Sequence, residues 1–183
     1  MNGKCLAIWI TGLPGSGKST IADELKSIFE ENKEKVELLR MDEMRNYVTP
    51  NPKYTDEERQ IVYNAFSFVA FKLVKYDINV IMDATGNLRK YRKLAKEIIP
   101  NFVQIYLECP LVIAIKRELN RKDTKGAPEK VYEKALEGES ETVPGLQTEY
   151  ETPLNPDLVI NTHKFSVEES VSKIWNKIKN NFD

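Results

Sequence analysis

The sequence has little of several features that mark particular classes of protein. Its 183 residues include 2 cysteines and 1 histidine, which excludes a disulfide framework, a four-thiolate zinc site and a histidine-rich metal site. The 27 lysines and arginines are balanced by 28 aspartates and glutamates, whereas proteins that bind long nucleic acids usually carry a basic excess. We therefore expect no nucleic acid polymer as a partner. A small anionic ligand remains compatible with this balance, because it needs only a few local cations.

Long hydrophobic runs are also lacking. No apolar stretch reaches the roughly 20 residues that a membrane-spanning helix needs, and Leu6–Ile10 is too short for the core of a signal peptide. We therefore expect a cytoplasmic protein with no membrane partner. With 41% hydrophobic and 30% charged residues, the composition is typical of a soluble globular protein, and we predict a single domain over residues 1–183.

Short apolar runs alternate with longer segments of helical periodicity. Such alternation predicts an α/β fold in which a central, mostly parallel five-stranded sheet lies between two layers of helices. The polar stretch from Arg121 to Thr152 is interrupted by glycines and prolines, and only Glu129–Leu136 within it has helical character. We expect this region to form a mobile lid over about residues 117–152. The predicted strands are Cys5–Thr11, Val36–Met41, Asn79–Asp83, Phe102–Leu107 and Asp157–Asn161. The main predicted helices are Lys18–Asn32, Asp56–Lys75, Leu88–Ile99, Pro110–Asn120 and Val167–Ile178.

A glycine-rich loop stands between the first predicted strand and the first predicted helix. Residues 12–19 match the pattern Gly-x4-Gly-Lys-Ser, in which backbone N–H groups and the positive end of the following helix surround a phosphate. In such a loop Lys18 bridges the β- and γ-phosphates, and the Ser19 hydroxyl is a ligand for Mg²⁺. The motif predicts binding of a nucleoside triphosphate. The residues expected to contact it are Gly12, Pro14, Gly15, Ser16, Gly17, Lys18, Ser19 and Thr20.

Charged residues follow the predicted strands at the sheet edge where ligands of α/β proteins bind. Asp83 ends the third strand, where an acid often steadies the Mg²⁺ shell, although capping of the next turn explains it equally well. Asp42 ends the second strand and precedes Arg45 by about one helical turn. This pair places a carboxylate near an accepting hydroxyl and a guanidinium near the anionic group of a substrate. A surface ion pair is the alternative.

Three further arginines are candidates for anion binding. Arg89 lies in the first turn after the third strand, and we expect it to contact the substrate, whereas the other basic residues of its helix are typical of a solvated face. Arg117 and Arg121 are four residues apart on a predicted helix and therefore face the same side. They are candidates for contact with the transferred phosphate, with exposed charges at a helix end as the alternative.

Several motifs together indicate a family. Trp9–Leu13 opens the glycine-rich loop, and Met41–Arg45 is similar to an Asp-Gly-Asp-x-x-Arg stretch. Tyr54–Arg59 is similar to Phe-Ser-x-x-Asp-Arg, Lys125-Gly126 to the start of Lys-Gly-Leu-Tyr, and Tyr150–Pro153 to Tyr-Glu-x-Pro. Over roughly residues 5–175 the chain thus resembles the adenylylsulfate kinases, which transfer the γ-phosphate of ATP to the 3′-hydroxyl of adenosine 5′-phosphosulfate.

This resemblance implies a fold, cofactors and site residues. The fold is that of a P-loop kinase with a lid, and the cofactors are ATP and Mg²⁺. Asp42 and Lys18 are the expected catalytic residues, with Asp42 orienting or deprotonating the accepting hydroxyl. Arg117, singled out above by its spacing, is expected to contact ATP. Ser19 and Asp83 are the expected metal ligands. The expected partner is a small anionic nucleotide, and a homodimer is the assembly that we allow for. The implied substrate-binding residues are Asp42, Arg45, Tyr54, Arg59, Arg89, Lys125 and Gly126.

The chain departs from the family pattern where the acceptor base is read. Val143 and Tyr54 stand where the family has two phenylalanines that sandwich adenine, and Arg40 stands for the first aspartate of Asp-Gly-Asp. We therefore keep open a related kinase that acts on another nucleotide-like acceptor, such as cytidine diphosphoramidate. A GTP-binding switch is a distant third reading, because residues 83–86 fit Asp-x-x-Gly but the sequence has no Asn-Lys-x-Asp segment. Further departures are Val62 and Asn64, which replace Asn and Arg, and Ala84–Asn87, which replaces Ile-Ser-Pro.

Overall fold

The computed structural model of the protein describes residues 5–128 and 130–179. Residues 1–4 and 180–183 of the predicted domain lie outside these ranges, as does Glu129, the predicted start of the lid helix. Within the described residues five strands form one all-parallel sheet in the order β2-β3-β1-β4-β5, which confirms the predicted fold class. The strands are β1 (Ala7–Thr11), β2 (Val36–Arg40), β3 (Asn79–Asp83), β4 (Phe102–Glu108) and β5 (Leu158–Asn161).

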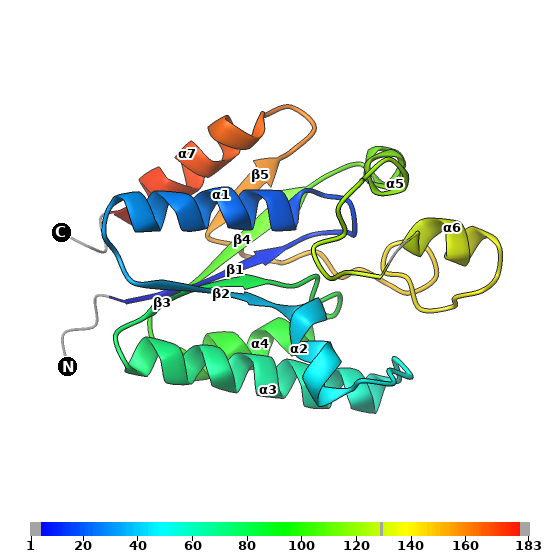
Figure 1. Ribbon diagram of the computed structural model, residues 1–183, viewed down its shortest axis with the longest axis horizontal. Coiled ribbons are helices and arrows are strands. Elements are labelled where there is room, and N and C mark those ends of the chain that lie inside the picture. Colours follow the sequence, from blue (N-terminus) through cyan, green and yellow to red (C-terminus); the bar gives the residue numbers. More distant parts are fainter. Residues whose placement is uncertain (1–4, 129, 180–183) are drawn as a thin grey trace.

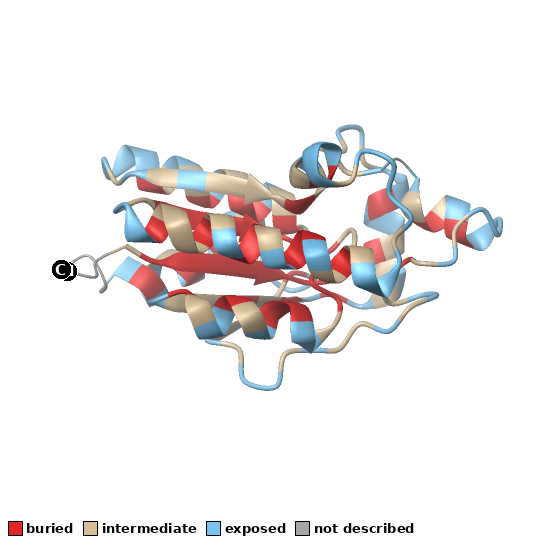
Figure 2. Ribbon diagram, turned by 90° about the horizontal axis from the view of Figure 1, so that it is seen from below, coloured by how far each residue is buried: buried red, intermediate tan, exposed pale blue. Residues whose placement is uncertain are grey.

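Side chains of the central strand alternate between two hydrophobic cores, as the pleat of a strand requires. Ile8 and Ile10 of β1 point into the core beneath one helical layer, whereas Ala7 and Trp9 point into the other. Every residue of β1 and β3 is buried, because helices cover both faces of the sheet. Figure 2 shows this buried centre, with exposed residues on the outer faces of the helices.

The helices form two layers and a separate end piece (Figure 1). The layer on one face contains α1 (Lys18–Glu31) and α7 (Val167–Ile178), and the layer on the other contains α2 (Met41–Val48), α3 (Asp56–Lys75) and α4 (Arg89–Ile98). The remaining helices, α5 (Leu111–Leu119) and α6 (Val131–Leu136), lie beyond the carboxyl ends of the strands. None of the helices in residues 5–128 and 130–179 is both long enough and apolar enough to cross a membrane.

Two local predictions are wrong. The second strand ends at Arg40 rather than at Met41, and Met41 begins α2, a helix that the periodicity did not reveal. Helix α5 ends at Leu119, so Arg121 lies after the helix instead of on it. The side-chain amide of Asn120 donates a 2.7 Å hydrogen bond to the carbonyl of Lys116, which satisfies a carbonyl that the end of the helix leaves free.

Candidate active site

A cavity of about 510 Å³ lies at the carboxyl edge of the sheet, where the glycine-rich loop, α2, the start of α3 and the lid meet. Parallel strands place their following loops at this edge, so residues far apart in the chain converge here. The structure brings together most of the side chains that the sequence singles out. The predicted residues that line the cavity are Pro14, Gly15, Gly17, Lys18, Ser19, Thr20, Asp42, Arg45, Tyr54, Arg59, Asp83, Arg117 and Lys125.

The glycine-rich loop packs directly against α5. Gly15 has φ of +75°, and a Cβ atom there would lie 2.1 Å from the carbonyl oxygen of Ala114, so only glycine fits. The Lys18 ammonium group donates a 2.9 Å hydrogen bond to the Leu13 carbonyl and faces the cavity. Burial lowers the pKa of Lys18, and the charges of Asp83 and Asp42 oppose this shift. Gly12 and Ser16 of the loop are buried and do not line the cavity.

Two carboxylates face this lysine, one at the end of a strand and one at the start of a helix. Asp83 ends β3, and Asp42 lies in the first turn of α2, directly after β2. Burial raises the pKa of Asp42, the charge of Asp83 raises it further, and Lys18 and Arg45 lower it. The cavity therefore holds an acid that gains a proton more readily than an exposed aspartate, beside a cation able to neutralise phosphate charge.

Two buried arginines enclose the ring of Tyr54. The guanidinium carbons of Arg45 and Arg59 lie 5.1 Å and 5.4 Å from the centre of the ring, within the range of cation–π contacts. Arg59 donates through Nε to the Tyr54 carbonyl at 3.1 Å and through Nη2 to the Thr142 carbonyl at 3.0 Å. Arg45 is paired with Glu58 at 3.4 Å. These contacts hold two cations in fixed positions, which suits recognition of an anionic group.

The lid supplies two more arginines, each held by a carbonyl. Arg117 donates to the Thr162 carbonyl at 2.7 Å and to the Thr162 hydroxyl at 3.2 Å. Arg121 donates to the Pro128 carbonyl at 2.6 Å and is paired with the buried Glu118 at 3.3 Å. Both arginines line the cavity, although α5 ends before Arg121.

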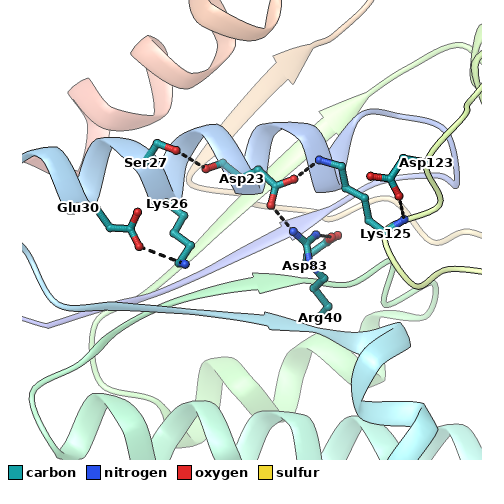
Figure 3. A network of polar contacts seen from close by, with 8 residues as sticks. All are labelled: Asp23, Lys26, Ser27, Glu30, Arg40, Asp83, Asp123 and Lys125. Carbon is teal, nitrogen blue, oxygen red and sulfur yellow. Dashed lines mark hydrogen bonds and ion pairs between the residues drawn. The ribbon is translucent and has the colours of Figure 1, made fainter.

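A chain of charges joins the lid to the sheet (Figure 3). Asp23 of α1 lies between Lys125 of the lid and Arg40 of β2 and is paired with both. Arg40 also donates to Asp83 at 3.1 Å, because these two residues are register partners on neighbouring strands. The sequence did not identify Asp23 or Arg40 as site residues. The departure of Arg40 from the family pattern was the available signal.

Two predicted substrate residues lie outside the cavity lining. Arg89 is exposed at the start of α4, where its side chain donates to the Thr152 carbonyl at 2.9 Å and lies 3.9 Å from Glu151. The end of the lid thus holds this arginine. Gly126 lines a neighbouring surface hollow together with Asp23. The structure does not bring either residue into contact with the cavity.

Other lining residues were missed by the sequence reasoning. Tyr63 lies one helical turn after Arg59, and this spacing was a signal that would have found it. Thr142 and Pro144 come from the irregular end of the lid, where no local pattern shows which way a side chain points. Val143 between them also lines the cavity, and the family resemblance had already placed it in the base pocket.

Comparison with known proteins identifies the family. The sequence matches the family model described as adenylylsulphate kinase over residues 4–161. It is 37% identical over 173 residues to an adenylyl-sulfate kinase of Halothermothrix orenii, covering 94% of this chain and 89% of that protein. It is also 33% identical to a probable adenylyl-sulfate kinase of Aeropyrum pernix, covering 96% of this chain and 93% of that protein. The solved structure of the Mycobacterium tuberculosis APS kinase in complex with AMPPNP and APS is similar, with a TM-score of 0.85 and 25% sequence identity. The match covers 96% of this chain and 98% of that one. The chain belongs to the adenylylsulphate kinase family of ATP-dependent phosphotransferases.

Proposed function

We propose that this protein transfers the γ-phosphate of ATP to the 3′-hydroxyl of adenosine 5′-phosphosulfate. The observation that carries the proposal is the convergence, in one cavity, of the glycine-rich loop with Asp42 and the two buried arginines Arg45 and Arg59. The loop, which binds the phosphates of the donor nucleotide, thereby faces the carboxylate of Asp42 and the two arginines, which can bind an anionic group. The names of the relatives support this choice of substrates.

On the donor side, Lys18 and the N-terminus of α1 hold the phosphates of ATP. The hydroxyl of Ser19 and the carboxylate of Asp83 both line the cavity, and this donor set fits Mg²⁺, which is usually held by one or two protein oxygens together with substrate phosphates and water. Within the described residues there is no cluster of three or more His, Cys, Asp or Glu side chains that could hold a metal ion without the nucleotide. When bound, Mg²⁺ neutralises charge on the phosphates.

On the acceptor side, Arg45 and Arg59 hold the anionic group of the acceptor, and Lys125 and Arg121 of the lid add positive charge nearby. Asp42 orients the 3′-hydroxyl or takes its proton as the new bond from oxygen to the γ-phosphorus forms. The bond from this phosphorus to the oxygen that bridges it to the β-phosphate breaks, and ADP leaves. Such transfer depends on positioning and charge neutralisation and needs no covalent intermediate on the enzyme.

The base pocket motivates a second candidate acceptor. Val143 lines the cavity and packs with Tyr132 and Ala135 of the lid, so an aliphatic side chain stands where the family resemblance implies an aromatic one. Loss of one stacking face removes on the order of 1–3 kcal/mol of base affinity. A pyrimidine acceptor such as cytidine diphosphoramidate is therefore the second candidate.

An acceptor panel tests the proposal. Purified protein is assayed with ATP and Mg²⁺ against adenosine 5′-phosphosulfate, cytidine diphosphoramidate and no acceptor, with GTP replacing ATP as a donor control. We expect kcat/KM for adenosine 5′-phosphosulfate to exceed that for the cytidine compound by at least about tenfold, the scale of one stacking contact. No turnover of adenosine 5′-phosphosulfate by folded protein that binds ATP would overturn the proposal. The homodimer stays a prediction, which light scattering of the same preparation tests.

A further inference from the structure

Helix α3 presents one side chain to the cavity beyond Arg59. Tyr63 lies one turn further along, is 3% exposed and lines the cavity. Its neighbours point elsewhere: Val62 is buried in the core, and exposed Asn64 accepts a 2.7 Å hydrogen bond from the side chain of Gln60. Among the described residues from Gln60 to the end of α3, Tyr63 is the one that reaches the cavity.

The Tyr63 ring is held in a fixed position. It stacks on Tyr91 with ring centres 4.4 Å apart and planes inclined by 17°, and on Trp9 at 6.0 Å and 21°. Trp9 is itself fixed, because its indole N–H donates to the Ala84 carbonyl at 2.9 Å. A ring clamped between two aromatic neighbours delivers its hydroxyl to one place without further loss of side-chain freedom on binding.

The Tyr63 hydroxyl has a proton that is not used. The backbone N–H of Gly86 donates to this oxygen at 2.9 Å. Gly86 has φ of +51°, and a Cβ atom there would lie 2.8 Å from the Trp9 ring, so only glycine fits at this close approach. A phenol has one O–H donor besides its acceptor lone pairs. Within the described part of the chain no acceptor takes this proton, although buried polar groups normally find a partner. Burial also raises the pKa of Tyr63, so the hydroxyl stays protonated at neutral pH.

The surroundings indicate which kind of ligand atom accepts a hydrogen bond from this hydroxyl. The neighbouring lining residues Arg45 and Arg59 are cations, and they favour a negatively charged oxygen at this end of the cavity. We propose that the Tyr63 hydroxyl donates a hydrogen bond to an oxygen of the acceptor's phosphosulfate group, which makes Tyr63 a specificity-determining residue. This inference rests on the proposed function, since it takes adenosine 5′-phosphosulfate as the acceptor.

Tyr91 offers a matched control. Its hydroxyl is also buried and has no hydrogen-bond partner among the described residues, it stacks on the same ring, and it does not line the cavity. Tyr63→Phe and Tyr91→Phe therefore remove the same atom from adjacent rings, one inside the site and one outside it.

The test measures KM for both substrates, kcat and the thermal melting temperature of the wild type and both variants. For Tyr63→Phe we expect KM for adenosine 5′-phosphosulfate to rise about tenfold to hundredfold, the range for a hydrogen bond to a charged group, with KM for ATP within about twofold of the wild type. For Tyr91→Phe we expect both KM values to be unchanged. The melting temperature measures separately how much stability is lost with the Gly86 hydrogen bond. A purely structural role of Tyr63 would not raise KM for one substrate and leave KM for the other unchanged.

The outcomes distinguish this inference from the proposed function. Wild-type turnover with an unchanged acceptor KM in Tyr63→Phe overturns the role of Tyr63 and leaves the function standing. An equal rise in both variants also overturns it, because the effect then comes from packing of the stacked rings. Absence of wild-type turnover overturns the function, and the role of Tyr63 toward a phosphosulfate falls with it. In that case the two variants are compared with the acceptor that the panel selects, to show whether the hydroxyl binds another anion.

Discussion

The donor half and the acceptor half of the cavity are built in different ways. Apart from Asp83 at the end of β3, the donor half is one continuous segment, Gly12 to Thr20, whose internal hydrogen bond from Lys18 to the Leu13 carbonyl spans five residues. The acceptor half is assembled from α2, α3 and the lid, and the hydrogen bond from Arg59 to the Thr142 carbonyl spans 83 residues. The first half is a local structure, and the second exists only after the chain has folded.

This difference separates what each half controls. The local loop holds the phosphates that carry charge in the transition state, so changes there affect turnover most strongly. The acceptor half depends on packing between distant segments, such as the lid against α3, so changes there alter how well one substrate is positioned. Variants of the two halves therefore ought to differ in which kinetic constant they change, as well as in the size of the effect.

The largest expected effect is that of Lys18→Ala in the donor half. Loss of a cation that faces the phosphates is expected to lower kcat by about 10²–10³-fold or more, because this charge acts on the transition state. Steady-state kinetics with both substrates at saturation measure it. Lys26→Ala is the control, since Lys26 lies on the same helix in an exposed pair with Glu30. A fall in kcat of less than tenfold in Lys18→Ala would show that Lys18 does not stabilise the transition state.

Asp42→Asn tests the boundary between the two halves. We expect kcat to fall about 10²-fold, the lower end for a positioned acid–base group, while ATP affinity measured by calorimetry changes little. Burial and the charge of Asp83 raise the pKa of Asp42. Activity is therefore lost as pH falls through a value above that of an ordinary aspartate, and it is retained above this value.

The pH profile of the variant sharpens this assignment. Asparagine does not titrate, so the acidic limb that belongs to Asp42 is expected to be absent from the profile of Asp42→Asn. Activity equal to that of the wild type, or an acidic limb that stays in place, would assign the role to another group.

The same contrast explains how much could be predicted from the sequence. The strands and the long helices follow from apolar runs and periodicity, and the glycine-rich loop follows from a motif whose geometry is local. Helix α2 escaped notice because its eight residues make only about two turns, with Met41 and Arg45 its buried residues. A pattern of that length does not establish a period.

The acceptor half could be predicted only in part, because contacts between distant segments decide where its side chains point. Arg89 was expected at the substrate, yet the Thr152 carbonyl and Glu151 hold it outside the cavity. Conversely, Tyr63 lines the cavity although its segment was predicted only as a helix, with no site residue beyond Arg59. The family resemblance supplied Arg59 and Tyr54, but no sequence pattern states which residue of the lid Arg59 contacts.

Arg59→Lys tests whether the acceptor half works by geometry rather than by charge alone. Lysine keeps the positive charge but loses the forked donors that reach the Tyr54 and Thr142 carbonyls together. We expect KM for the acceptor to rise about tenfold, corresponding to loss of one hydrogen bond made by a charged group, with KM for ATP unchanged. Lys75→Arg, an exposed change at the end of the same helix, is the control. An equal rise in both KM values would contradict the division into two halves.

The smallest expected effect is that of Asp23→Asn, which breaks the charge chain between the two halves. The pairs of Asp23 with Lys125 and Arg40 are partly exposed, with Asp23 38% exposed, so they contribute at most about 1 kcal/mol to the free energy of unfolding. Arg40 keeps its partner Asp83, and the donor half should therefore be unaffected. We expect KM for the acceptor to change by about threefold or less, while the lid loses a point of attachment to α1.

Limited proteolysis with trypsin measures this attachment, because Lys122 and Lys125 are cleavage sites in that segment, and cleavage there should accelerate several-fold. Glu30→Gln on the same helix removes an exposed pair of the same kind and should leave the cleavage rate unchanged. Equal cleavage rates in the two variants would show that other contacts hold the lid in place and that the charge chain adds nothing to them.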